Sequence, residues 1–337
     1  MKYSIIVATY NRLDELKELT QSLQNLDFSA DGFELVLADD GSEDGTREFI
    51  DAADFNFKIN YLRQENKGPG AARNLGMSKA KGEYFLFVDS DCTLPSDYLE
   101  QVDRALEENE YHAFGGPDTY REDFPPLLKA INYSMTSFIG TGGTRGSKKS
   151  VTKFYPRSFN MGIHRSVYEK IGGMGGLRHG QDMDFSARIY KAGFKVGLIP
   201  EAYVYHKRRT SIKRFFKQIF NWGVARINLG RKHPDLLKPI HFAPAVIVLG
   251  SFLILLLAPF FLLFQGLLYL ILVTAVILAL YAFIEASAIY KNIKVGALSV
   301  VTLFIQIFAY GLGTLSGVLQ WISGKNTAKG FTKNYYK

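Results

Sequence analysis

Two acidic residues directly follow an apolar stretch of the chain. Residues 84–88, YFLFV, are typical of a buried strand, and Asp89, Ser90 and Asp91 come next. Two carboxylates separated by one residue suit a hard divalent cation that also binds the oxygens of a diphosphate. A zinc site would require more histidine or cysteine ligands than this stretch offers. The sequence therefore predicts a site for Mg²⁺ or Mn²⁺, the alternative being a solvated turn.

Two further polar clusters follow stretches that are typical of strands. Thr9, Tyr10 and Asn11 end the first stretch, and Asp39 and Asp40 end the second. The alternation of such strands with helices predicts an α/β fold with a mostly parallel sheet, in which ligands bind at the carboxyl ends of the strands. Each cluster alone is also compatible with a helix cap or a turn. We expect strands at residues 4–10, 33–40, 58–64 and 83–91, alternating with helices at residues 14–26, 43–53 and 68–80.

A glycine-rich stretch begins the helix expected at residues 68–80. Gly68, Gly70 and the adjoining alanines would let a ligand approach the backbone, while the helix N-terminus and Arg73 favour an anion. The spacing differs from that of a P-loop and from that of a dinucleotide-binding fingerprint. Packing of the helix on the sheet is the alternative reason for these small residues.

The order of these segments resembles that of the family 2 glycosyltransferases, which have the GT-A fold. The resemblance covers about residues 2–210 and rests on SIIVATYNR, VLADDGSEDGT, the stretch from NKGPGAARN to FVDSDC, FNMGIHRSVYEKIGGM and GQDMDF, in that order. It implies a Rossmann-like mixed sheet with helices on both faces, and an inverting, metal-dependent transfer from a nucleotide-diphospho-sugar. It also implies that Asp89 and Asp91 hold the metal and the donor diphosphate. The nucleotide-sugar-binding residues that it implies are Thr9, Tyr10, Asn11, Arg12, Asp39, Asp40, Gly68, Arg73, Asp89, Ser90, Asn160 and Gln181.

Asp182, within GQDMDF, matches the catalytic aspartate of that family. An inverting transfer needs a base that takes the proton of the acceptor hydroxyl while this hydroxyl attacks the anomeric carbon. The family commonly has a Glu-Asp pair, whereas this chain has Gln181, so that Asp184 becomes the nearest second acid. An N-cap for the following helix is the structural alternative for Asp182, and the two roles are compatible.

Two residues near the end of the resemblance complete the implied site. Asn160, within FNMG, matches a loop that lines the cleft for donor sugar and acceptor. His206 lies where some relatives have a ligand of the metal or of the diphosphate, the alternative being a histidine without such a role. Residues 141–150, TGGTRGSKKS, are typical either of a lid over the acceptor or of a surface loop.

The last third of the chain contains long uncharged stretches. Residues 242–284 and 295–324 have no charged side chain, and a bilayer crossing takes about 20 residues. A soluble core of buried helices is the alternative, although soluble helices of this length normally carry charges on one face. We expect a transmembrane region at residues 239–324 with helices at residues 242–264, 267–286 and 295–322, and a tight turn at Gln265-Gly266.

A basic segment precedes these stretches. Residues 207–238 contain ten Lys or Arg and one acid, Asp235, a bias that marks the cytoplasmic side of a membrane helix and attracts anionic lipid. We expect an amphipathic helix in the membrane interface within residues 211–238. Because the cations adjoin an apolar stretch and do not alternate with stacking aromatics, nucleic acid is not an expected partner.

The topology and the redox state can also be predicted. The N-terminal residues have too short an apolar run for a signal peptide, so we expect a catalytic domain at residues 1–210 on the cytoplasmic face of the cell membrane. Three crossings would place the basic tail, residues 325–337, on the opposite side, against the positive-inside tendency. Cys92 is the single cysteine, which excludes an intrachain disulfide; we expect a small buried residue, the alternative being a metal ligand.

These features together predict a membrane-anchored enzyme of cell-envelope polysaccharide biosynthesis, which transfers a sugar to a lipid-linked or glycan acceptor. A polyprenyl-phosphate glycosyltransferase is one alternative, but such relatives tend to have Leu-Gln after the second aspartate, where this chain has Cys92-Thr93. A non-catalytic sugar-binding or assembly protein is another alternative. The carboxylates Asp39, Asp89, Asp91 and Asp182 argue against that one.

Overall fold

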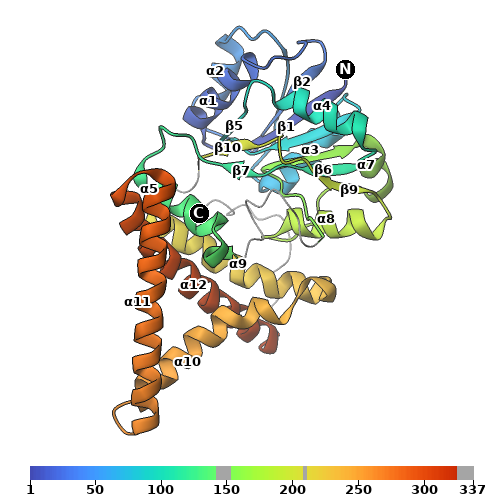
Figure 1. Cartoon of the computed structure of the whole chain (residues 1–337). Helices are drawn as coiled ribbons and strands as arrows, with labels where there is room; N and C mark the ends of the chain where they lie inside the picture. Colours follow the sequence, from blue (N-terminus) through green and yellow to red (C-terminus); the bar gives the residue numbers. More distant parts are fainter. Residues whose placement is uncertain (142–152, 208–210, 325–337) are drawn as a thin grey trace. The chain divides into compact units, whose positions relative to one another are not determined.

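The computed structural model describes residues 1–141, 153–207 and 211–324 (Figure 1). These residues form two units, of which the first comprises residues 1–119 and 153–207 and the second comprises residues 120–141 and 211–324. The predicted domain of residues 1–210 therefore differs from the structure in one segment. Residues 120–141 belong to the unit that contains the apolar C-terminal helices.

The first unit is built around a seven-stranded sheet with the strand order β3-β2-β1-β4-β8-β6-β9. Strands β3, β2, β1 and β4 are parallel to one another, whereas β8 runs antiparallel to both β4 and β6. The carboxyl ends of the four parallel strands and the start of β8 therefore lie at one edge of the sheet. The strands are β1 (Tyr3–Thr9), β2 (Phe33–Asp39), β3 (Lys58–Arg63), β4 (Tyr84–Val88), β6 (Ala113–Gly115), β8 (Asn160–His164) and β9 (Val196–Leu198).

Alternate residues of the strands pack on opposite faces of this sheet. Ile5 and Leu86 belong to one buried core and Ile6 and Phe87 to another, because side chains alternate along a strand. Helices thus cover both faces, which confirms the predicted α/β architecture (Figure 1). The first face packs against α1 (Leu13–Gln24), α2 (Thr46–Ala52) and α4 (Tyr98–Glu108), and the second against α3 (Pro69–Lys79), α7 (Arg165–Ile171) and α8 (Gln181–Lys191).

A second sheet of three short strands has the order β5-β10-β7. It consists of β5 (Cys92–Thr93), β7 (Asp118–Thr119) and β10 (Val204–His206). Strand β10 pairs antiparallel with β5, so that His206 lies opposite Cys92, and parallel with β7, so that Val204 lies opposite Asp118. This small sheet therefore brings together residues from three distant segments of the sequence.

The second unit is entirely helical. It contains three helices that are long and apolar enough to cross a membrane, at Pro239–Leu257, Leu262–Tyr290 and Ile293–Ile322. Few residues of the first two are buried within the protein, as is typical of helices that face lipid. The elements are α5 (Pro126–Thr136), α6 (Phe138–Thr141), α9 (Ile212–Lys232), the 3₁₀ helices η1 (Pro234–Leu236) and η2 (Pro239–Phe242), α10 (Ala243–Leu257), α11 (Leu262–Tyr290) and α12 (Ile293–Ile322).

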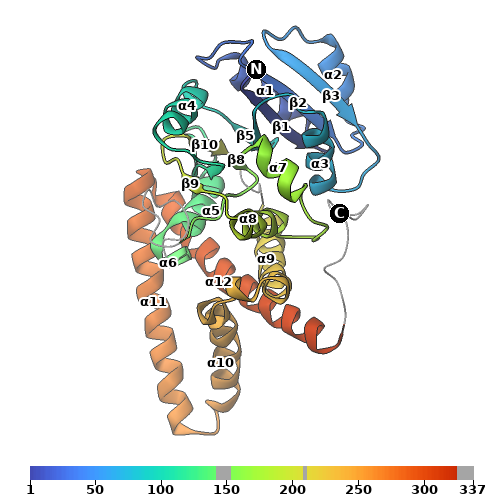
Figure 2. The ribbon, with the colours of Figure 1, turned by 90° about the vertical axis from the view of Figure 1, so that its right-hand side faces the viewer.

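The turn between the first two apolar helices lies at residues 258–261, so the prediction of a turn at Gln265-Gly266 is wrong (Figure 2). Both of those residues lie inside α11. Pro259 follows α10, and a proline ends a helix because it lacks an amide hydrogen and its ring clashes with the preceding turn. Glycine, by contrast, is common inside membrane helices.

Helix α9 packs along α12 through glycine residues (Figure 2). A Cβ atom at Gly313 would overlap the carbonyl oxygen of Phe220, and one at Gly223 would overlap that of Tyr310. Small residues of this kind allow membrane helices to approach closely. The apolar side of the predicted amphipathic helix is therefore largely buried within this unit. Its buried residues include Phe215, Ile219 and Ile227, whereas Ile212 and Phe216 are exposed.

Polar side chains join α5 to the apolar helices. The carboxylate of Glu285 in α11 accepts hydrogen bonds from Tyr133 of α5 (2.5 Å) and from Tyr281 (2.8 Å). The hydroxyl groups of Ser134 and Thr302 lie 2.6 Å apart in the contact between α5 and α12. Polar groups in an apolar environment need such partners, which explains why residues 120–141 fold with the C-terminal helices.

Two predictions lie outside the described residues. The glycine-rich loop predicted at residues 141–150 is described at Thr141 alone, which ends α6. The basic tail at residues 325–337 is not among the described residues.

Candidate active site

Asp89 directly follows β4 and meets a cation from α3. The Arg73 Nη2 atom lies 2.5 Å from the Asp89 Oδ1 atom. The guanidinium group is buried, whereas 30% of the Asp89 side chain is exposed. A charge-assisted hydrogen bond of this kind is strong and fixes both groups. Two residues that were predicted to bind the donor are thus in contact at the edge of the sheet.

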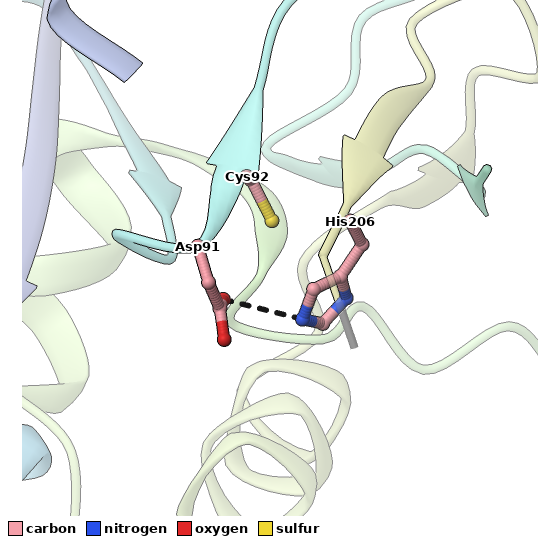
Figure 3. A group of neighbouring side chains, drawn as sticks. All are labelled: Asp91, Cys92 and His206. Atoms are coloured by element: carbon pink, nitrogen blue, oxygen red, sulfur yellow. Dashed lines mark ion pairs between the residues drawn. The ribbon is translucent and has the colours of Figure 1, made fainter. Parts of the chain in front are cut away.

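Asp91 and His206 meet where β5 pairs with β10 (Figure 3). The His206 Nε2 atom lies 3.3 Å from the Asp91 Oδ1 atom, and the Cys92 thiol lies within 4.8 Å of both groups. Carboxylate and imidazole ligands together fit a divalent ion such as Mn²⁺ better than Mg²⁺, which prefers oxygen alone. Of the three predicted metal ligands, the structure groups Asp91 with His206, while Asp89 pairs with Arg73.

The other side of the His206 ring faces Asp118. The Asp118 Oδ2 atom lies 3.2 Å from the His206 Nδ1 atom, and its side chain is 3% exposed. Burial lowers the pKa of His206, but the carboxylates of Asp91 and Asp118 outweigh this effect and raise the pKa from 6.5 to about 9. The imidazole is therefore held between two carboxylates.

Cys92 is fully buried beside this pair. Burial raises the pKa of its thiol well above the ordinary value, and the carboxylates of Asp91, Asp89 and Asp118 raise it further. Because the thiolate is the form that binds metals, a thiol that keeps its proton is a poor ligand. The environment of Cys92 thus favours the predicted role of a small buried residue over that of a metal ligand.

Asp39 and Asp40, at the end of β2, are fully buried. Asp39 accepts hydrogen bonds from the Tyr61 hydroxyl (2.6 Å) and from the Ser42 N–H (2.8 Å). Asp40 accepts one from the Gly68 N–H (2.7 Å). Gly68 has a φ of 91°, which glycine adopts without strain, and it precedes α3. Asp40 thus takes the Gly68 N–H, and a role of Gly68 in nucleotide-sugar binding stays a prediction.

The end of β1 borders an open cleft. Tyr10 lines this cleft, whereas the Asn11 side chain accepts a hydrogen bond from the Glu43 N–H (2.8 Å). Arg12 forms an ion pair with Glu15 (2.7 Å). The buried Thr9 hydroxyl has no hydrogen-bond partner among the described residues. The cleft has a volume of about 670 Å³ and is lined by Tyr10, Gly41, Glu43, Arg63, Gln64, Glu65 and Asn66.

Asp182 lies in the first turn of α8. Gly180 occupies the N-cap position of this helix, so the alternative of an N-cap role for Asp182 is wrong. The Asp182 side chain is 20% exposed, and its Oδ2 atom lies 3.8 Å from the Arg157 Nη1 atom. Gln181 is buried. The spare acid Asp184 is also fully buried and pairs with Arg188 (3.3 Å), which leaves Asp182 as the accessible carboxylate of GQDMDF.

Asn160 is a buried residue at the start of β8, and its place in a donor-sugar cleft stays a prediction. Its side-chain oxygen accepts a hydrogen bond from the Tyr98 hydroxyl (2.6 Å). Its side-chain nitrogen donates to the carbonyl oxygens of Ala202 (2.7 Å) and Pro117 (3.4 Å). The amide is 1% exposed and fully engaged, and so holds the turn before β7 against the segment before β10. Ser90, also buried, separates the two aspartates of the motif.

The structure adds three residues that sequence reasoning missed. These are Asp118 beside His206, Arg157 beside Asp182 and Tyr61 beside Asp39. Asp118 follows Gly115-Gly116-Pro117, a stretch typical of a turn, but nothing in its vicinity indicates the pairing of β7 with β10. Arg157 precedes β8 within a stretch that has no regular spacing.

Two protein-family models match the sequence. The model of Glycosyl transferase family 2 matches residues 4–172, which is half of the chain. The model of Glycosyl transferase family 21 matches residues 138–323. The first match contains Asp39, Asp89 and Asp91, and the second contains Asp182, His206 and the apolar helices.

Individual relatives cover different parts of the chain. Poly(ribitol-phosphate) beta-N-acetylglucosaminyltransferase TarS of Staphylococcus aureus is 38% identical over 111 residues, which is 32% of this chain and 19% of that protein. This chain thus spans about a fifth of the length of this relative. Succinoglycan biosynthesis protein ExoA of Rhizobium meliloti is 24% identical over 257 residues, 74% of this chain and 77% of that protein.

Solved structures share the fold. The mannosyltransferase PcManGT from Pyrobaculum calidifontis, in complex with GDP-Man and Mn²⁺, is similar with a TM-score of 0.61 and 19% identity, covering 90% of this chain and 87% of that one. TarS 1-349 of S. aureus, in complex with UDP-GlcNAc, has a TM-score of 0.52 and 19% identity, covering 99% of this chain and 98% of that one. The GT-A-like fold, followed by long apolar helices, is thereby confirmed.

Proposed function

Because the chain belongs to glycosyltransferase family 2, we propose that it transfers a sugar from a nucleotide-diphospho-sugar to an acceptor hydroxyl with inversion at the anomeric carbon. One observation carries this proposal. The first unit combines an accessible carboxylate, Asp182, with an Asp91-His206 pair and an Arg73-Asp89 pair beside the carboxyl ends of parallel strands. The donor site of such sheets lies at that edge.

The donor is proposed to bind with its nucleoside in the cleft lined by Tyr10 and its diphosphate near Asp91. Mn²⁺ held by Asp91 and His206, with Asp89 nearby, would neutralise charge on the diphosphate leaving group. Arg73 supplies a fixed positive charge next to Asp89. The relatives provide two starting donors, since TarS was solved with UDP-GlcNAc and PcManGT with GDP-Man.

Asp182 is proposed to act as the general base. Its carboxylate takes the proton from the acceptor hydroxyl, the hydroxyl oxygen forms a bond to the anomeric carbon, and the bond to the nucleoside diphosphate breaks. Two features support this role, namely the 20% exposure of the Asp182 side chain and the burial of Asp184. The Arg157 Nη1 atom lies 3.8 Å from the Asp182 Oδ2 atom, so a fixed cation borders this carboxylate.

The acceptor is proposed to be a lipid-linked sugar or a glycan at the cytoplasmic face of a membrane. The three apolar helices support a membrane location. The basic segment that precedes them supports a cytoplasmic position for the first unit. The likeness to ExoA, a protein of succinoglycan biosynthesis, favours polysaccharide assembly over the transfer of a sugar to a soluble metabolite.

A donor screen tests this proposal. Full-length protein in lipid nanodiscs is incubated with Mn²⁺ and single UDP- or GDP-sugars, and the melting temperature and the release of nucleoside diphosphate are measured. We expect one donor to raise the melting temperature, because a ligand that binds the folded state stabilises it. Slow hydrolysis of that donor, or its transfer to extracted lipid-linked sugars, is expected to stop when EDTA is added.

Two variants show whether the thermal shift and the turnover depend on the proposed metal site. Asp91→Asn is expected to abolish both the donor-dependent thermal shift and turnover. Asp51→Asn, which alters an exposed ion pair with Arg47, serves as the control and is expected to behave like wild type. The proposal fails if none of the nucleotide sugars shifts the melting temperature, or if Asp91→Asn turns over its donor at the wild-type rate.

A further inference from the structure

Asp118 holds a hydrogen on the Nδ1 atom of His206. An ionised carboxylate only accepts hydrogen bonds, so the contact of 3.2 Å between Asp118 Oδ2 and His206 Nδ1 requires that Nδ1 donates. The opposite nitrogen, Nε2, faces Asp91 at 3.3 Å. A metal bound at Nε2 would displace the hydrogen of that atom to solvent, whereas the hydrogen on Nδ1 would stay on the ring and be donated to Asp118.

The backbone around Asp118 keeps this carboxylate in place. Strand β7 pairs with β10, the strand that carries His206. In the preceding turn, a Cβ atom at Gly116 would overlap the carbonyl oxygen of Ala202, so the two segments pass too closely for any larger residue. Asn160 bridges the same two segments by hydrogen bonds. Asp118 is therefore held rigidly and shielded from water, with 3% of its side chain exposed.

The His206 ring is also restrained from its side. The Phe159 ring packs against it with a distance of 5.4 Å between the ring centroids. The ring orientation and the hydrogen on Nδ1 are thus both defined in the absence of a metal. Partners of this kind behind a metal-binding histidine orient the ligand and raise its basicity.

We propose that Asp118 is a positioning residue that keeps the hydrogen on Nδ1 of His206 and thereby leaves Nε2 as the ring nitrogen that, together with Asp91, binds a divalent metal. This inference rests on the metal site of the proposed function. It adds a residue that neither the resemblance nor the family matches assign. The geometry predicts that metal affinity depends on the hydrogen-bonding character of residue 118 and not merely on its size.

The variant Asp118→Asn tests this inference, because it preserves the shape of the side chain. Its uncharged amide can donate to Nδ1 as well as accept from it, so the variant no longer restricts the hydrogen to Nδ1 and allows the tautomer with hydrogen on Nε2, the ligand atom. The probe is Mn²⁺ alone, without donor, added to the full chain in nanodiscs. Binding is measured by electron paramagnetic resonance, and coordination of histidine by the ¹⁴N modulation of the electron spin echo at saturating Mn²⁺.

We expect Asp118→Asn to weaken Mn²⁺ binding by about 10- to 100-fold and to lose the ¹⁴N modulation. Glu34→Gln is the matched control, since Glu34 is a similarly buried carboxylate that accepts hydrogen bonds from Ser4 and from the Lys81 N–H. It is expected to retain both the affinity and the modulation. His206→Gln gives the spectrum of a site without imidazole.

Three results would overturn the inference. The first is wild-type affinity in Asp118→Asn. The second is weaker binding with intact ¹⁴N modulation, which would mean that Asp118 contributes charge alone. The third is wild-type protein that binds no Mn²⁺, which would also remove the metal from the proposed function. If wild type binds Mn²⁺ with ¹⁴N modulation, Asp118→Asn loses it and no sugar is transferred, the inference stands and the proposed transfer fails.

Discussion

At the scale of single residues, two aspartates of the same helical turn have opposite environments. Asp182 and Asp184 are two positions apart on α8, and residues at that spacing do not share a helix face. The Asp182 side chain is 20% exposed, whereas the Asp184 side chain is fully buried against Arg188. Asp184 thus stabilises the fold, whereas the Asp182 carboxylate remains accessible to a substrate.

This difference predicts opposite phenotypes for two conservative substitutions. Asp182→Asn is expected to lower the rate of transfer by about 10²- to 10⁴-fold, the usual contribution of a general base, and to leave donor binding and the melting temperature unchanged. Asp184→Asn is expected to destabilise the protein by roughly 1–3 kcal/mol, because Arg188 loses a charged partner, and to keep transfer within a few-fold of wild type at low temperature. Thermal unfolding and single-turnover rates measure the two effects. The assignment fails if Asp182→Asn retains transfer or if the two phenotypes are exchanged.

Sequence reasoning identified the residues that belong to ordered motifs. Asp89, Asp91 and His206 lie within or next to paired strands, and the structure shows Asp91 and His206 in contact. Asp118 was missed because its partner is distant in the sequence and its strand has two residues, too few for any periodicity. The hydrogen bonds of Asn160 to Tyr98 and Ala202 could not be predicted either, because a motif does not show which way its side chain points.

At the scale of elements, the contact between α9 and α12 depends on the absence of side chains. A Cβ atom at Gly313 would overlap a backbone carbonyl oxygen of α9, and backbone atoms cannot move aside as the end of a flexible side chain can. Gly250 in α10 is different, since no atom of the described residues lies within 4 Å of a Cβ atom built there. An added methyl group would therefore clash at Gly313 and find space at Gly250.

The substitution Gly313→Ala is therefore expected to destabilise the protein by about 1–3 kcal/mol through overpacking. Gly250→Ala, the control, is expected to be neutral or slightly stabilising, because alanine favours the helix more than glycine does. Thermal unfolding in one detergent measures both variants. Equal melting temperatures for the two variants would contradict the close packing of α9 on α12.

The elements that sequence reasoning predicted well are those with long, regular patterns. The first four strands and the three helices between them lie within a few residues of their predicted bounds. The turn predicted at Gln265-Gly266 lies instead at residues 258–261, which contain Pro259. Inside an apolar environment a glycine costs a helix little, whereas a proline removes a hydrogen bond that water cannot replace.

At the scale of the whole molecule, the chain alternates between the two units. It leaves the first unit after Thr119, returns to it, and leaves it again after Lys207. The boundary of the first unit therefore could not be predicted from the motifs within residues 1–210. Residues 120–141 lie between these motifs in the sequence but belong to the second unit. Their docking depends on contacts such as that between Tyr133 and Glu285, across a long separation in sequence.

Three apolar helices predict that the ends of the chain lie on opposite sides of the membrane. A reporter before Met1 is expected to be cytoplasmic, and one after Lys337 to be on the other side, because an odd number of crossings separates them. Paired fusions to a fluorescent protein and to alkaline phosphatase measure this. A cytoplasmic reporter at both ends would mean that one of the three helices does not cross.

The carboxylate of Glu285 also sets the depth at which α11 can sit in a bilayer. The helix has 29 residues and a length of about 43 Å, more than the roughly 30 Å of a hydrocarbon layer. The uncharged residues before Glu285 suffice for one crossing, so we expect the last turns, with Glu285 bound to Tyr133 and Tyr281, to extend into the headgroup region. A shift of the helix inward by one turn would bring a carboxyl group and two phenols into the hydrocarbon layer. We therefore expect this cluster of polar contacts to limit how deeply α11 enters the membrane.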